Sequence, residues 1–181
     1  MIAITQKQKK IALRAFATLA ALAAAVALPQ LCHLLGGAAG VGSALGEMLL
    51  PMHLPILLAG FFGGPVVGSI AGALAPLLSF AMTGMPKAAL LPFMVIELCA
   101  YGLAAGLLSK TKLPVIAQVL IAQVAGRALR AIAIVIAVYG FSYAALPVSI
   151  IWSSIRVGLV GILLQCLLIP LAVYRVKHAS R

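Results

Sequence analysis

LPVIAQVLIAQVAGRALRAIAIVIAVY, residues 113–139, is long enough to cross a lipid bilayer, because about 20 apolar residues span the hydrocarbon core. Arg127 and Arg130 nevertheless lie near its middle. An arginine at membrane depth costs roughly 2.5–3.5 kcal/mol on insertion scales, so both side chains are expected to face protein, water or a ligand rather than lipid. At about 100° per residue they share one helix face, with Gln123 one turn below Arg127. This polar stripe is the clearest functional signal in the sequence.

The composition of the whole chain defines the class of protein. Its 181 residues are 65% hydrophobic and only 8% charged. A soluble domain of this size could not cover such an apolar chain with polar groups. We therefore predict an all-α integral membrane protein with a single transmembrane domain over residues 1–181. A glycine-rich phosphate loop of the GxxxxGK[ST] type is absent from the sequence, which excludes ATP hydrolysis by that route.

The charge balance is strongly basic, with thirteen Lys and Arg against two acidic residues. In a soluble protein this would suggest a nucleic-acid partner. Here most basic residues flank apolar segments, so we expect no nucleic acid and interpret the charge as a sign of topology. The basic ends of the chain and residues 109–112 predict cytoplasmic N- and C-termini. Lys87 is the one loop charge that this topology places on the outer side of the membrane, against the positive-inside rule. Three distant cysteines without CxxC spacing are expected to be buried, and no metal site or cofactor is predicted.

Six transmembrane helices are predicted, at about residues 11–32, 51–62, 66–82, 88–108, 113–139 and 148–173. The basic and then apolar N-terminus resembles a signal peptide, but we expect a retained first helix because the remaining chain is also membrane-embedded. Residues 33–47 are predicted to form a glycine-rich outer loop, which is either flexible or a lid over a site. The Gly-Gly-Pro sequence at 63–65 predicts a tight turn that makes 51–62 and 66–82 a hairpin.

Small residues recur along the first predicted helix. Ala17, Ala21 and Ala25 follow one another at intervals of four residues. Small side chains at this spacing let two helices approach closely in lipid. The alanine seam formed by these three residues therefore either packs inside the chain or docks on another membrane protein.

Four ionisable groups on three predicted helices lie in the outer half of the membrane. At a rise of about 1.5 Å per residue, Arg127, Arg130 and Arg156 fall near the depth of Glu97. Three guanidiniums against one carboxylate leave excess positive charge, and a buried charge without compensation is very costly. In one interpretation Glu97 pairs with an arginine to hold the bundle together and the others snorkel outward. In the other, an outward-facing pocket binds the carboxylate or phosphate of a small solute, which arginine can hold with two hydrogen bonds.

Further side chains are candidates for the same pocket. Tyr101 is one turn from Glu97 and Trp152 is one turn from Arg156, so each would supply a flat wall. His53 lies between two prolines in LPMHLP, where it is either structural or a ligand contact. The predicted substrate-binding residues are Arg127, Arg130, Arg156, Glu97, Gln123, His53, Tyr101 and Trp152.

The chain resembles the substrate-binding S components of energy-coupling factor (ECF) vitamin transporters, which are bacterial six-helix membrane proteins of similar length. The alanine seam resembles the surface by which S components dock on their transmembrane coupling protein. Residues 50–86, LPMHLPILLAGFFGGPVVGSIAGALAPLLSFAMTGMP, resemble the hairpin of the second and third helices with its following loop. Residues 92–108, PFMVIELCAYGLAAGLL, resemble the fourth helix. The likeness covers most of the chain.

This resemblance implies a multi-pass protein of the bacterial cell membrane with a coupling protein and two cytoplasmic ATPases as partners. It implies docking through Ala17, Ala21 and Ala25, and transport by toppling of the whole subunit in the membrane. It also implies high-affinity uptake of a vitamin or related micronutrient as the small-molecule substrate. The arginine excess favours an anionic substrate such as pantothenate or folate. A porphyrin such as heme, whose two propionates would fit the three arginines beside His53 or Met52, is ranked below these vitamins, as is cobalamin. Neutral riboflavin would leave the arginines unexplained.

Two other classes of protein stay open at this point. An intramembrane enzyme acting on a lipid head group would use His53 and Glu97 as general base or acid. The sequence has no HxxxH, HExxH or GxSxG pattern, so an enzyme is not predicted. A structural membrane subunit would bind no small molecule, and stoichiometric binding of one would argue against both alternatives.

Overall fold

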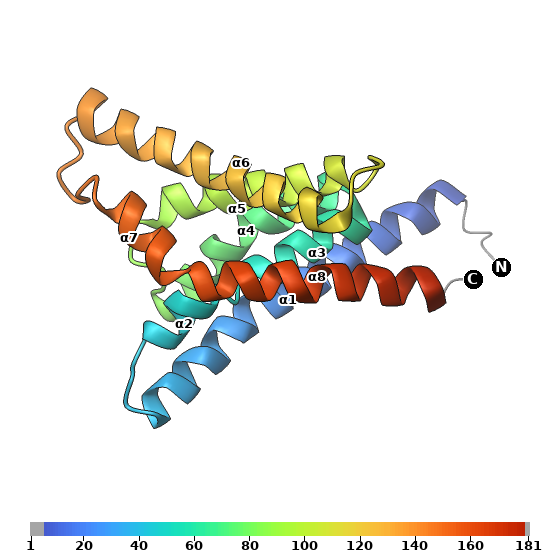
Figure 1. Cartoon of the computed structure of the whole chain (residues 1–181), viewed down its shortest axis with the longest axis horizontal. Coiled ribbons are helices and arrows are strands. Elements are labelled where there is room, and N and C mark those ends of the chain that lie inside the picture. The colour runs from blue at the N-terminus through green and yellow to red at the C-terminus, as the bar shows by residue number, and fades with distance from the viewer. Residues whose placement is uncertain (1–5, 180–181) are drawn as a thin grey trace.

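Six segments of the structure, a computed structural model that describes residues 6–179, are long and apolar enough to cross a membrane. Figure 1 shows them as a bundle of helices. The elements are α1 (Gln6–Ala38), α2 (Ala44–Leu49), α3 (His53–Gly63), α4 (Pro65–Thr83), α5 (Leu91–Leu108), α6 (Val115–Val135), the π-helical turn η1 (Ile136–Gly140), α7 (Ile150–Val157) and α8 (Leu159–Ala179). The second span combines α2 and α3, and the fifth combines α6 and η1. The predicted class, a six-span all-α membrane protein, is confirmed.

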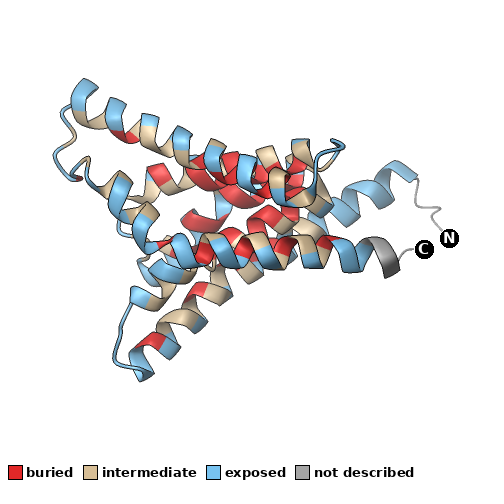
Figure 2. Ribbon diagram, in the orientation of Figure 1, coloured by how far each residue is buried: buried red, intermediate tan, exposed pale blue. Residues whose placement is uncertain are grey.

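The surface of the bundle is apolar, as a lipid environment requires. Large side chains such as Phe16, Leu129 and Leu163 are exposed on the outside of the helices. Figure 2 shows that the buried residues lie on the helix faces turned toward the centre. Because lipid tails are as apolar as these side chains, close packing rather than water exclusion must hold the helices together.

Glycines bring α4 and α5 into direct backbone contact. A Cβ atom at Gly102 would collide with the carbonyl oxygen of Gly68, and a Cβ at Gly72 would collide with that of Leu98. Only glycine permits this approach, which explains why these two helices pack so tightly. This closely packed pair carries Glu97, the one charged residue of α5.

The basic segments of the chain gather at one end of the bundle. The beginning of α1, the end of α8 and the loop between α5 and α6 lie at this end, and α2 and α7 lie at the other (Figure 1). The α5–α6 loop carries Lys110 and Lys112, and α1 begins with Lys7, Lys9 and Lys10. The arrangement agrees with termini on a common side, while the assignment of that side to the cytoplasm stays a prediction.

The alanine seam packs inside the chain rather than facing outward. Ala25 is completely buried and Ala21 is 9% exposed, and both belong to the main hydrophobic core with Ala17 packed against it. Helix α1 contacts α3 and α4. The structure thus agrees with internal packing of the seam, while docking of these residues on another membrane protein stays a prediction. A four-residue spacing of small side chains indicates a close helix neighbour, but it does not say whether that neighbour belongs to the same chain.

Helix boundaries differ from the predicted ones at two places. The expected glycine-rich loop over 33–47 is mostly helical, because α1 continues to Ala38 and α2 begins at Ala44. The turn between them folds back, with the amides of Val41 and Gly42 donating to the carbonyl of Gly36. The expected single helix over 148–173 is two helices separated at Gly158. A Cβ atom at Gly158 would lie 2.8 Å from the Leu50 side chain, so the break accommodates the α2–α3 junction.

Candidate functional site: a buried charge cluster beside a cavity

Glu97 is the centre of the site and is fully buried on α5. The hydroxyl of Tyr101, one turn further along the same helix, donates a hydrogen bond of 3.0 Å to its Oε1 atom. A Cβ atom at Gly126 would collide with the Tyr101 ring, so this glycine of α6 makes room for it. The close approach of α6 to α5 at this level brings the next residue, Arg127, toward the carboxylate.

Two arginines and one histidine surround the carboxylate. Arg130 donates from Nη1 to Oε2 of Glu97 over 2.9 Å, and the Nη1 atom of Arg127 lies 4.0 Å from Oε1. The Nε2 atom of His53, from the first turn of α3, lies 3.8 Å from Oε1. Its ring is tilted against that of Tyr101, with the centroids 5.3 Å apart. Three helices therefore converge on one negative charge.

The cluster carries more positive charge than Glu97 neutralises. The side chains of Arg127 and Arg130 are only 13% and 12% exposed. In the described part of the chain, the Nε atoms of both arginines and both ring nitrogens of His53 are buried without a hydrogen-bond partner. Buried polar atoms nearly always have a partner. The cluster is therefore incomplete in its own hydrogen bonding.

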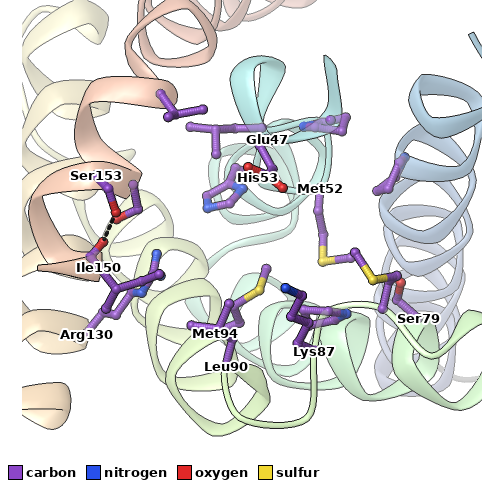
Figure 3. Close-up of a pocket in the computed structure, with 18 of the residues that line it drawn as sticks. Glu47, Met52, His53, Ser79, Lys87, Leu90, Met94, Arg130, Ile150 and Ser153 are labelled. Atoms are coloured by element: carbon purple, nitrogen blue, oxygen red, sulfur yellow. Dashed lines mark hydrogen bonds between the residues drawn. The ribbon is translucent and has the colours of Figure 1, made fainter. Parts of the chain in front are cut away.

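A cavity of about 420 Å³ opens beside the cluster. Figure 3 shows its wall, to which Arg130, His53, Lys87 and Glu47 contribute from different elements. Arg127 also lines it, whereas Glu97 lies behind the arginines and histidine and is not part of the wall. The other lining residues are Pro29, His33, Gly46, Leu50, Pro51, Met52, Ser79, Met85, Pro86, Leu90, Met94, Ile150, Ser153, Ser154 and Val157.

Besides Glu97, two of the predicted site residues are buried away from the cavity. Tyr101 contacts Glu97 from behind. Gln123 donates to the side-chain oxygen of Gln165 over 2.8 Å, and Gln165 in turn donates to the carbonyl of Leu50 over 3.3 Å. This chain of hydrogen bonds ties α6 and α8 to the residue that joins α2 and α3. Gln123 thus lies on the expected stripe but makes a contact within the protein.

Arg156 and Trp152 point away from the cavity. Both are exposed, Trp152 at 68%, and neither lines the cavity. They lie four residues apart on one face of α7, whereas Ser153, Ser154 and Val157 of the same helix line the cavity. The sequence placed Arg156 on a helix that borders the cavity, but the rotation of α7 about its axis decides which of its faces meets the cavity.

Sequence reasoning missed several residues of the wall, among them Glu47, Met94 and Lys87. Most of them are apolar or lie in connecting segments, where periodicity gives no signal. Lys87 did give a signal in the sequence, because it was the only loop charge that disagreed with the predicted topology. Its position in the wall offers a reason for that disagreement.

The fold and the cluster define a multi-pass membrane protein with a solute-sized cavity whose wall is enriched in positive charge. The family model described as "ECF transporter, substrate-specific component" matches residues 9–173. The chain belongs to this family and is a transport subunit, as its resemblance to S components predicted. Searches of curated proteins and of solved structures gave no match.

Proposed function

We propose that this subunit binds an anionic micronutrient in the cavity and takes it up across the bacterial cell membrane. The carboxylate or phosphate of the substrate would bind Arg127 and Arg130, with His53 as a further contact. Pantothenate-like and folate-like compounds belong to this chemical class. The proposal assigns no catalysis to this chain.

The observation that carries the proposal is the ratio of two largely buried guanidiniums to one fully buried carboxylate. Glu97 accepts a hydrogen bond from Arg130 but stands 4.0 Å from Arg127, so it orients both without using all their N–H donors. A second anion on the cavity side would remove the excess charge and accept the remaining donors. Fixing the guanidiniums in advance also lowers the entropy cost of binding.

The size and lining of the cavity suit a small organic molecule. Its volume of about 420 Å³ falls within the range of about 300–1,000 Å³ that is common for small-molecule sites. Met52, Met94 and Leu90 give it apolar walls that would hold the uncharged part of a substrate. Methionine side chains are flexible and polarisable, which suits contact with a ring of irregular outline.

The energy for uptake would come from partners. Membership of the family supports association with a transmembrane coupling protein and two cytoplasmic ATPases. The sequence contains no GxxxxGK[ST] phosphate-binding loop, so the ATP would be hydrolysed by these partners. The end of the bundle that carries the basic segments would face the cytoplasm, and the cavity near α2 and α7 would then open to the outside. Binding from outside followed by release inside requires a reorientation, which the family resemblance describes as toppling.

Mass spectrometry of small molecules released from the purified, detergent-solubilised protein tests the proposal. We expect a stoichiometric compound that carries a carboxylate or phosphate, and we expect its amount to fall sharply in Arg127→Gln. Arg156→Gln is the matched control, because Arg156 is exposed and lies outside the cavity wall. A neutral compound bound equally by all three proteins would overturn the anionic assignment, and a protein that binds nothing from a panel of vitamins would overturn the transport proposal.

A further inference from the structure

Lys87 is the one cation of the cavity wall that the cluster around Glu97 does not include. It lies in the segment between α4 and α5 and lines the cavity while remaining exposed, which places it at the mouth. The positive-inside pattern gives no reason for a lysine in this connection. Its place in the wall of the binding cavity suggests a role in recognition.

Neither acidic residue of the chain neutralises Lys87. Glu97 forms its ion pairs with Arg127 and Arg130, and its carboxylate also lies 3.8 Å from the ring of His53. Glu47 accepts a hydrogen bond of 3.2 Å from the hydroxyl of Ser43. Within residues 6–179, no ion pair of 4.0 Å or less joins Lys87 to either carboxylate. The ammonium group is therefore available to a ligand.

The positive charge of the wall lies in two separate places. In Figure 3 Lys87 and Arg130 lie on either side of Met94 and Leu90. These two apolar residues belong to the beginning of α5 and the turn before it, and they line the cavity. A single compact anion bound at one of the two cationic regions would leave the other without a contact to the ligand.

We propose that the substrate carries two separate anionic groups joined by an apolar or aromatic middle. One group binds Arg127 and Arg130, the other binds Lys87, and the middle packs on Met94 and Leu90. The inference rests on the proposed function and narrows the class of substrate. Compounds with two acidic groups at a distance fit this wall better than pantothenate, whose only ionised group is one carboxylate.

A series of α,ω-dicarboxylic acids from adipic to dodecanedioic acid tests this arrangement. Each diacid is compared with its monomethyl ester, which keeps the chain between the two carbonyl groups and removes one charge. Binding to the purified full chain in detergent is measured as ligand-dependent thermal stabilisation across a titration. At the best length the wild type should bind the diacid about tenfold more tightly than the ester, as expected for one charge-assisted contact. Lys87→Gln should lose this preference and bind the ester as the wild type does.

Lys110→Gln is the matched control, because Lys110 lies in the α5–α6 loop at the other end of the bundle. It should keep the full preference for the diacid. Equal responses to acid and ester at every length, including no response to either, would overturn the inference. A preference that survives in Lys87→Gln would overturn it as well.

The compound released from the wild-type protein separates this inference from the proposed function. A released compound with two acidic groups, recovered in smaller amount from Lys87→Gln, supports both. A compound with one acidic group that depends on Arg127 would overturn the two-anion inference and leave the proposed function standing. A neutral compound would overturn both.

Discussion

Glu97→Gln is the substitution that tests the charge cluster most directly. It keeps the shape of the side chain but removes the negative charge that lies within 4.0 Å of both Arg127 and Arg130. Removing one partner of a buried ion pair costs about 3–5 kcal/mol, because the remaining charge is left uncompensated. The amide can still accept from Tyr101 or Arg130, and both guanidiniums border an open cavity, so we expect the lower end, about 3 kcal/mol.

Thermal unfolding of the purified protein in detergent measures this loss. A decrease of about 3 kcal/mol in the free energy of unfolding lowers Tm by roughly 6–12 °C for a chain of this length. Glu47→Gln is the matched control because Glu47 is exposed, and its Tm should change by no more than about 2 °C. Glu97→Gln combined with Arg130→Gln should recover part of the lost stability, since the double variant buries one positive charge fewer.

Two outcomes would refute this reasoning. Equal Tm values for Glu97→Gln and Glu47→Gln would show that the carboxylate does not compensate the arginines. A double variant with Arg130→Gln that loses the sum of the two single effects would show that Glu97 and Arg130 act independently.

The remaining predictions concern the binding wall and the packing of the helices. Arg127→Gln should weaken binding of the acid identified by mass spectrometry by about tenfold or more, because a charge-assisted contact is lost. Arg156→Gln should leave the affinity unchanged. Equal affinities of the two variants in isothermal titration calorimetry would contradict the site. Ala21→Leu should lower Tm, because the added carbon atoms must enter a packed core. Ala20→Leu, on the exposed side of α1, should leave Tm unchanged. A lower Tm for Ala20→Leu than for Ala21→Leu would show that the seam faces outward. Gly102→Ala should reduce the yield of monodisperse protein in size-exclusion chromatography, since its Cβ would collide with the backbone of α4; a normal elution profile would contradict that contact.

The six spans could be predicted because spanning a membrane depends on local properties. Length and hydropathy belong to a segment alone, so the structure places helices in all six predicted regions. The breaks in them depend on distant contacts. Gly158 ends α7 where Leu50 and Arg127 approach it, and no pattern within the sequence of α7 and α8 contains that information.

The alanine seam is a second feature whose neighbours could not be predicted from the sequence. Four-residue spacing predicted a close helix neighbour for α1, and the structure supplies α3 and α4 from the same chain. The spacing describes the shape of one helix face. Which partner fills that face depends on the arrangement of the other helices, which propensity and hydropathy do not encode.

For the site, the sequence was sufficient to identify the charges that required an explanation. Arg127, Arg130 and Glu97 lie within long apolar segments, and the cost of placing ionised groups in hydrocarbon requires them to meet protein, water or ligand. How that requirement is met depends on the packing of the helices against one another. The backbone contact of α4 with α5 and the space at Gly126 bring the arginines onto Glu97, while the rotation of α7 turns Arg156 outward. Depth in a membrane follows from position along a helix, but the direction of a side chain follows from how that helix packs against its neighbours.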